Sequence, residues 1–316
     1  MILITALLAA GLALAVFAPA ALRRIDFAAA PVAGMGAWLG AVAAMIGCGG
    51  LVLIALAWPG DPPGEFFAGS VLGCLGAIEP VIVTWTASLI MPVVALGVTV
   101  PTGQLARIAV GHRGRGATLR RRHNELVEVL GRVDPSGSKL VWLDHPVPLA
   151  YSVAGRGGYV VVTDGLARCL TDAQWRAVLA HEHAHLRGFH HHIVGVGQIL
   201  ARAFPWIPLF AAAPTALATL VELAADRAAA TATDPQALSS ALHTVAAHGA
   251  TTPAAPLGLI DESLAMRLEC LSATPDSRTA SRRTAAALVF ATMLLAPAAS
   301  ALAVGLSAAV AWLSMV

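Results

Sequence analysis

The residues best suited to chemistry stand in one short run, His181-Glu182-His183-Ala184-His185. The run fits H-E-x-x-H, in which two histidines four positions apart share one face of a helix and can both reach one zinc ion. Glu182 directly follows the first histidine and so lies beside the metal, where its carboxylate can take a proton from water. We interpret His183 as a bystander, because it points to another side of the helix. The pattern predicts metal-assisted hydrolysis.

The sequence offers two candidates for the third zinc ligand. His191 completes the longer metzincin pattern H-E-x-x-H-x-x-G-x-x-H, which also requires a methionine-containing turn. Glu222 lies 41 residues after His181, and Asp226 is four residues further along, so the two carboxylates share a helical face. One of them can bind zinc while the other holds a ligand histidine by a hydrogen bond. Both ligand sets are open at this point.

Three local patterns predict the elements that position this run. Thr171-Asp172-Ala173-Gln174 has the form of a capping box, so we expect a helix to begin there and to continue through His185. Lys139–Leu143 and Tyr159–Thr163 are short β-branched runs and predict strands. Thr118–Leu130 carries its charges on one face and predicts a further helix. The region around the histidines is therefore expected to be α+β.

The composition of the whole chain predicts an integral membrane protein. Of its 316 residues, 57% are hydrophobic and 12% are charged, against about 25% charged in soluble domains. These figures exclude disordered and collagen-like chains. The four cysteines are too scattered for a disulfide scaffold or a thiolate zinc site. Four stretches have about the 20 apolar residues that a span needs: Ile2–Leu22, Val32–Ala57, Ile78–Val100 and Ala285–Val316.

The charges beside these spans predict how the chain crosses the membrane. Arg23 and Arg24 follow the first span and a block of arginines follows the third, whereas the loop Pro59–Ser70 carries only acidic charges. Because Lys and Arg favour the cytoplasmic side, we expect a multi-pass protein of the inner or plasma membrane with both termini outside. The expected domains are residues 1–106 with three spans, a cytoplasmic zinc-binding domain at 107–283, and a fourth span at 284–316.

An apolar stretch inside the cytoplasmic region limits the topology further. Residues Ile193–Val221 are nearly uncharged and are broken at Pro205-Trp206-Ile207-Pro208 into legs of about twelve residues, each too short to cross the membrane. If His181 and Glu222 bind the same zinc, both must lie on one side of the membrane. We therefore expect a re-entrant or membrane-surface hairpin at 193–221, with its irregular tip shielded by protein.

Two longer runs carry a family resemblance: Tyr151–Arg187, which contains the H-E-x-x-H pattern, and Glu222-Leu-Ala-Ala-Asp226. Both resemble motifs of the BlaR/MecR-type membrane metallopeptidases, which are gluzincins. The resemblance covers most of the chain. It implies four transmembrane helices and a cytoplasmic α+β metalloprotease domain between the third and the fourth. It also implies the following roles: His181, His185 and Glu222 as zinc ligands, Glu182 as the base, and Asp226 as the residue that holds a ligand histidine.

The resemblance further implies how a substrate is handled. Tyr159–Thr163 would be the edge strand that pairs with a substrate peptide. The substrate would be a winged-helix DNA-binding repressor that is inactivated by cleavage in signal transduction, and direct nucleic-acid binding by this chain is not implied. The chain ends at Val316, so we expect it to lack the family's extracellular penicillin-binding sensor. It also carries His190-His191-His192 where the family often has an acidic residue.

The sequence therefore predicts a zinc metalloendopeptidase, an antirepressor if the resemblance extends to function, whose partners are a protein substrate and the lipid bilayer. Two alternatives are open: a protease for membrane-protein quality control or processing, and a receptor that keeps zinc only for its structure. Oligomeric state is open as well, a homo-oligomer included. Four residues are candidates for stabilising the oxyanion: Tyr151, Tyr159, His190 and His243.

Overall fold

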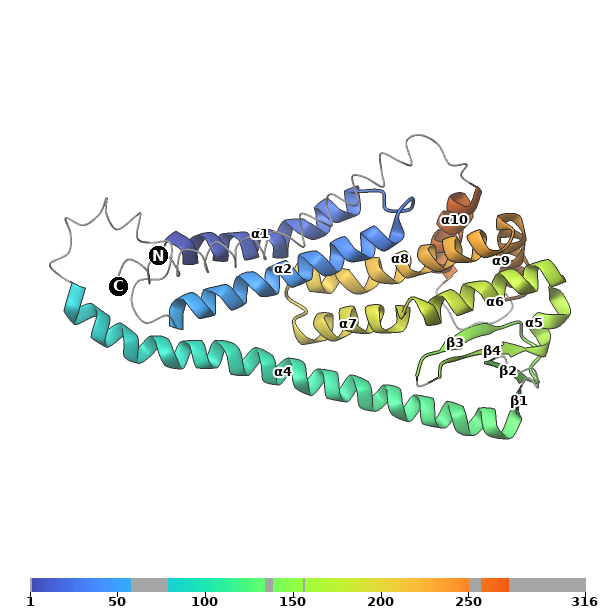
Figure 1. Cartoon of the computed structure of the whole chain (residues 1–316), viewed down its shortest axis with the longest axis horizontal. Coiled ribbons are helices and arrows are strands. Elements are labelled where there is room, and N and C mark those ends of the chain that lie inside the picture. The colour runs from blue at the N-terminus through green and yellow to red at the C-terminus, as the bar shows by residue number, and fades with distance from the viewer. Residues whose placement is uncertain (1, 58–78, 134–138, 156, 250–256, 273–316) are drawn as a thin grey trace, which may run out of the picture.

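The computed structural model describes residues 2–57, 79–133, 139–155, 157–249 and 257–272, and this part of the chain is mainly helical (Figure 1). The helices are α1 (Ile2–Arg24), α2 (Pro31–Ala57), α4 (Glu79–Leu130), α5 (Asp164–Cys169), α6 (Asp172–Arg187), α7 (His190–Ala203), α8 (Pro208–Ala232), α9 (Pro235–Gly249) and α10 (Leu257–Ser272). The strands are β1 (Gly131–Val133), β2 (Leu140–Leu143), β3 (Ala150–Val153) and β4 (Tyr159–Thr163). The predicted combination of apolar helices with a small sheet is confirmed. The predicted span Ala285–Val316 lies outside the described residues.

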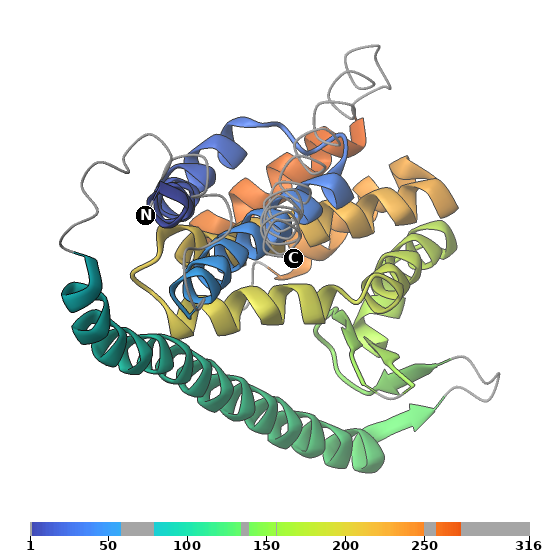
Figure 2. The same cartoon turned by 60° about the vertical axis from the view of Figure 1, so that its left-hand side comes forward.

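An apolar bundle of α1, α2, α7 and α8 forms the largest core (Figures 1 and 2). Helix α2 approaches its neighbours closely at Gly34, where an added Cβ would stand 2.8 Å from the Phe27 side chain and 3.0 Å from that of Leu220 on α8. Four large side chains of the core are at most 2% exposed: Leu22, Trp38, Phe210 and Leu217. This packing fixes α8 firmly against the two N-terminal helices.

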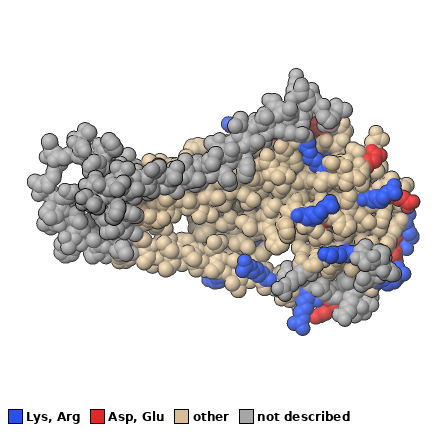
Figure 3. Space-filling view, viewed as in Figure 1, with Lys and Arg blue, Asp and Glu red and all other residues tan. Residues whose placement is uncertain are grey.

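Four helices of the described part are long and apolar enough to cross a membrane. The segments Ile4–Arg24 and Pro31–Leu56 agree with the first two predicted spans. The third candidate is Val94–Thr118, which lies further along the chain than the predicted Ile78–Val100. The fourth is Pro208–Ala232, a segment that the sequence analysis had placed in a hairpin. In the space-filling view, the charged side chains of this face gather toward the end that holds the sheet and α6 (Figure 3).

Helix α4 unites two segments that the sequence analysis had separated. The predicted span Ile78–Val100 and the predicted helix Thr118–Leu130 belong to one helix of 52 residues, with Pro92 and Pro101 inside it. A proline removes one backbone hydrogen bond, and membrane helices tolerate this because neighbouring groups satisfy the freed carbonyl. Figures 1 and 2 show α4 along one side of the bundle, next to α7. There the Gln104 side chain donates a hydrogen bond of 2.5 Å to the Ala203 carbonyl.

The apolar hairpin is present, but its second leg is longer than predicted. Helix α7 has 14 residues, and the chain turns at the predicted proline pair. Helix α8 then has 25 residues, so the predicted leg of about twelve, ending at Val221, is wrong. Pro208 opens α8 in its first turn, where a missing N–H costs nothing. Pro214 does not end the helix, because the alanine-rich run beyond it favours helix strongly.

The four strands form one sheet in the order β1-β2-β4-β3. β2 and β4 are parallel, and the other two pairs are antiparallel. The expected edge strand Tyr159–Thr163 is β4, which is hydrogen-bonded on both sides, so that expectation is wrong. Its residues Val160, Val161 and Val162 are fully buried, as is usual for an interior strand. The edge strands of the described sheet are β1 and β3, and β3 is the one that packs against α6. The β3 segment has no strong strand pattern of its own.

Helix α6 begins as the sequence predicts and lies between the sheet and the bundle. Its capping box is complete: the Gln174 N–H donates to the Thr171 hydroxyl at 3.4 Å, and the Thr171 N–H donates to the Gln174 side chain at 2.8 Å. Trp175 in the first turn stacks on Trp142 of β2 with ring centroids 5.2 Å apart. The last turns of α6 pack against α8 and β3. The histidine run is thereby aimed at the inner face of α8.

Candidate metal centre

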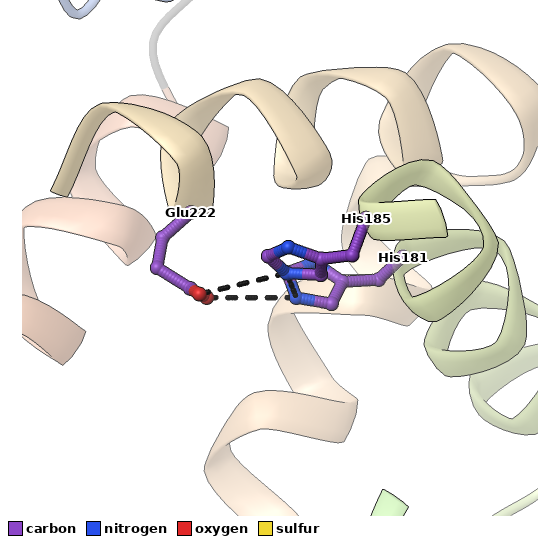
Figure 4. A group of neighbouring side chains, drawn as sticks. All are labelled: His181, His185 and Glu222. Atoms are coloured by element: carbon purple, nitrogen blue, oxygen red, sulfur yellow. Dashed lines mark hydrogen bonds and ion pairs between the residues drawn. The ribbon is translucent and has the colours of Figure 1, made fainter. Parts of the chain in front are cut away.

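Helices α6 and α8 bring three potential metal donors together (Figure 4). His181 and His185 stand one turn apart on α6, with their Nε2 atoms 3.0 Å from each other. The carboxylate of Glu222 on α8 lies opposite these nitrogens, with Oε2 3.5 Å from His181 Nε2 and Oε1 3.5 Å from His185 Nε2. One donor atom from each of the three residues lies within 4.8 Å of the other two. Donors at about 2.0–2.2 Å around a tetrahedral zinc ion lie about 3.3–3.5 Å apart, so a small adjustment of these side chains would accommodate such an ion.

Asp226 lies one turn beyond Glu222 and reaches the other nitrogen of His181. Its Oδ1 is 2.9 Å from His181 Nδ1, although the carboxylate stands off the line of an ideal N–H···O hydrogen bond. Both Asp226 and His181 are buried. The sequence analysis placed Asp226 in this position relative to a ligand histidine, and the geometry agrees with it.

Arg267 of α10 completes this side of the site. Its guanidinium donates two hydrogen bonds to Asp226, at 2.6 and 2.7 Å, and a third nitrogen lies 3.3 Å from a Glu222 oxygen. Such a bidentate pair is among the strongest polar contacts in proteins. Arg267 could not be identified from the sequence, because nothing in its own helix indicates that it contacts Asp226, 41 residues earlier in the chain. The only local signal is a single arginine in an otherwise apolar and acidic helix.

His185 also has a partner for its second nitrogen. Its Nδ1 is 3.0 Å from Nδ1 of His190, the first residue of α7, and both rings are buried. The sequence analysis had named His190 as one of four candidates for the oxyanion donor. The structure places it behind His185 instead, while its ring still forms part of the cavity wall.

Glu182 lies beside the donor atoms and contacts the edge strand. Its carboxylate interacts with the side chain and backbone of Ser152 on β3, and Ser152 Oγ is in turn 3.3 Å from His191 Nε2. Burial raises the pKa of the Glu182 carboxyl, although the charge of His181 and the contact with Ser152 oppose this. A raised pKa suits a carboxylate that must accept and release a proton near neutral pH.

The two histidines outside the donor set occupy other places. His191 faces Ser152, and its ring centroid is 6.4 Å from that of His185. Within the described residues, the group of donor atoms that lie within 4.8 Å of one another contains His181, His185 and Glu222 but not His191. His183 Nδ1 is 2.7 Å from the Leu179 carbonyl of its own helix, away from the site.

Without a metal, the two donor histidines differ sharply in their affinity for protons. Burial lowers the pKa of His181, but the carboxylates of Asp226 and Glu222 outweigh it and raise this pKa to about 9. Burial and the charge of His181 lower the pKa of His185 to about 4. At neutral pH His181 is therefore the positively charged histidine of the metal-free pair, and His185 is neutral. A metal ion must displace a proton from His181 to bind.

The donor atoms open into a cavity of about 790 Å³. One wall is the edge strand β3 with Tyr151 and Ser152, and the opposite wall is helix α8. His112 of α4 and several residues of α7 extend the cavity toward the apolar bundle. Of the candidates for the oxyanion donor, Tyr151 lines the cavity. The described lining does not include Tyr159 or His243.

Comparison with known proteins gives one match. The sequence profile of peptidase family M48 matches residues 114–280, more than half of the chain. The matched region begins inside α4 and contains every donor and partner residue described above. No curated protein and no solved structure matches the chain. The narrower resemblance to the BlaR/MecR type is not confirmed by this match.

Proposed function

The chain belongs to peptidase family M48, a family of metallopeptidases, and on that premise we propose that it is a membrane-embedded zinc metalloendopeptidase. One observation carries the proposal. The donor atoms of His181, His185 and Glu222 converge at distances that suit zinc, and the carboxylate of Glu182 stands next to them in the same cavity. The combination is that of a gluzincin active site.

The metal would be held by one imidazole nitrogen each from His181 and His185 and by a carboxylate oxygen of Glu222. Three protein ligands leave a position open, and zinc bound in this way acts as a Lewis acid that polarises a carbonyl group and makes water more acidic. Asp226 orients the His181 ring through its Nδ1. Arg267 holds Asp226 and balances the charge of the two α8 carboxylates.

Glu182 is the base of the proposed reaction. Its carboxylate accepts a proton from the attacking water and delivers it to the nitrogen of the leaving amine. Ser152 contacts this carboxylate and so restricts its rotation. No described strand pairs with β3 on the side that faces away from β4, and that side would pair with an extended substrate peptide.

The position of the site favours substrates that are held at the membrane. Val221 and Ala224, which flank Glu222 on α8, pack into the same core as α1 and α2. The zinc site is thus built directly on helices of the membrane-spanning type, and membrane proteins or proteins attached to the membrane would reach it most readily. This favours quality control or processing of membrane proteins. Cleavage of a winged-helix repressor is the second candidate, and it rests on the resemblance to the BlaR/MecR type.

We place the site on the cytoplasmic side of the inner or plasma membrane, with both termini outside. The support for this orientation is the distribution of arginines, which follow the first span and recur in the C-terminal half of α4. A cysteine introduced near the N-terminus should then react with a membrane-impermeant thiol reagent in intact cells. One introduced beside Arg187 should react only after the membrane is permeabilised. The reverse labelling pattern would overturn the orientation.

The activity is tested by comparing new protein N-termini in cells that express the wild type or Glu182→Ala. Cuts that depend on Glu182 and occur in many membrane proteins would support a processing protease. A few cuts in one cytoplasmic regulator would support the signalling alternative. If no new N-terminus depends on Glu182 under any growth condition, the chain is a zinc-stabilised receptor and the proposal is wrong.

A further inference from the structure

His185 can place only one of its ring nitrogens on a metal, and the structure selects which one. Its Nε2 faces the other donors, 3.0 Å from His181 Nε2 and 3.5 Å from a Glu222 oxygen. A neutral imidazole that binds a metal through Nε2 carries its proton on Nδ1. That Nδ1–H needs an acceptor, because the ring is only 8% exposed.

The acceptor within reach is His190. Its Nδ1 lies 3.0 Å from His185 Nδ1, and the two rings meet edge to face with centroids 4.9 Å apart. His190 is 5% exposed, so water competes little for either nitrogen. A hydrogen bond forms here when the Nδ1–H of His185 donates to Nδ1 of His190, which then carries its own proton on Nε2.

We propose that His190 is a positioning residue for zinc, whose Nδ1 accepts the Nδ1–H of His185 and thereby presents His185 Nε2 to the metal. The inference rests on the proposed zinc site. Each donor histidine then has its own partner at Nδ1: Asp226 for His181 and His190 for His185. Such partners typically raise metal affinity 10- to 100-fold.

Two features of the backbone between α6 and α7 support this role. At Gly188, an added Cβ would stand 2.3 Å from His190 Nε2 and 2.6 Å from Cδ2, so the ring lies in space that only a glycine leaves free. Phe189 then adopts the left-handed conformation, with φ of 52°, which is unfavourable for a bulky residue. Its side chain is 67% exposed and gives no packing reason for this. Both features turn His190 back onto His185.

The direct test is the zinc dissociation constant of the full-length protein in detergent, measured by competition with a chromogenic chelator. We expect His190→Leu to weaken zinc binding about 10- to 100-fold. His190→Asn should bind nearly as the wild type does, because an amide oxygen can take the place of Nδ1. His192→Leu is the matched control on the exposed side of the same helical turn, and it should have no effect.

A second variant disturbs the contact between His185 and His190 without replacing either histidine. Gly188 has φ of −80°, so alanine fits its backbone, but the added Cβ would displace the His190 ring. Gly188→Ala should therefore weaken zinc binding as His190→Leu does, and both should alter the visible spectrum of the cobalt-substituted protein. Thermal unfolding of the metal-free variants checks that they are folded.

The outcomes separate this inference from the proposed function. If the wild type binds zinc and His190→Leu and Gly188→Ala bind it equally well, the role of His190 is wrong and the proposed function stands. If His190→Asn is as weak as His190→Leu, the role of His190 is wrong again. If the wild type binds no zinc, the proposed function itself fails.

Discussion

Helix α8 and the Val94–Thr118 part of α4 are similar in length and hydrophobicity. They differ in how much of each is buried against the rest of the protein. Each candidate span has 25 residues. Half of the most apolar stretch of α8 is buried inside the protein, whereas none of the corresponding stretch of α4 is. Helix α8 carries the buried Asp226 and the partly exposed Glu222, while α4 exposes large apolar side chains such as Leu96 and Val110.

The difference shows that length and hydrophobicity identify a helix that can enter a membrane but not the surface it faces. An exposed apolar helix suits lipid, because lipid tails are as apolar as leucine. A helix that packs against protein can carry charged groups, provided that each has a partner. Helix α8 meets this condition through His181, His185 and Arg267. The candidate metal site is therefore built into a helix that composition alone would assign to the bilayer.

The largest effect should come from removing the carboxylate that α8 supplies. We expect Glu222→Ala to lower zinc affinity at least about 100-fold, since a direct ligand matters more than the partners behind it. Proteolysis should fall to background. Zinc content after purification and cleavage of a test peptide measure the two losses. Glu125→Ala on α4, which removes a carboxylate of an exposed ion pair, is the matched control. Full zinc content in Glu222→Ala would refute the role of α8.

The next effect concerns the arginine that balances the α8 carboxylates. Arg267→Met leaves Asp226 buried without its cation and should destabilise the metal-free protein by about 3–5 kcal/mol. Arg121→Met on α4 breaks an ion pair whose side chains are 84% and 62% exposed, so we expect a change of about 0.5 kcal/mol or less. Thermal unfolding in detergent compares the two variants. Equal losses of stability would contradict the expectation that the buried ion pair contributes more than the exposed one.

A smaller effect is expected from apolar side chains. Leu217 of α8 is 1% exposed, and Leu217→Ala should cost about 2–3 kcal/mol through the cavity that it leaves. Val110 of α4 is 67% exposed, and Val110→Ala should change the unfolding temperature little. Chemical unfolding of both variants checks this. A larger loss for Val110→Ala would show that α4 packs against protein rather than lipid.

The pH dependence of metal binding tests the charge that the α8 carboxylates impose on the site. The carboxylates of α8 raise the pKa of His181 to about 9 in the metal-free site. Below that pH zinc competes with one proton, so its affinity should fall about tenfold for each pH unit as the pH is lowered from 9 toward 7. Above pH 9 the proton is gone and this dependence should end. Calorimetry in buffers of different ionisation enthalpy counts the released proton. An affinity independent of pH between 7 and 9 would contradict the assigned charge of the site.

The parts of this account that the sequence predicted are those encoded locally. The capping box at Thr171, the pair of histidines on α6 and the carboxylates on α8 each depend on residues within four positions of one another. Helical periodicity converts such spacings into a shared face. The structure joins these pieces as expected, and the predicted strands became β2 and β4.

The missed parts depend on packing between distant segments. The order of strands in a sheet is a tertiary property, so β3 could not be identified as the edge from its own residues. The contact of Arg267 with Asp226 joins α10 to α8, between which α9 lies in the chain. The length of the second leg was underestimated because the leg was taken to end with the uncharged stretch at Val221, whereas α8 continues to Ala232.

The most direct test of the central claim is the anomalous difference map at the zinc absorption edge, from crystals of the full-length protein purified with zinc. We predict one peak about 2.0–2.2 Å from Nε2 of His181, Nε2 of His185 and a carboxylate oxygen of Glu222. A peak that instead has His191 as its third ligand, or the absence of any peak between α6 and α8, would contradict the account.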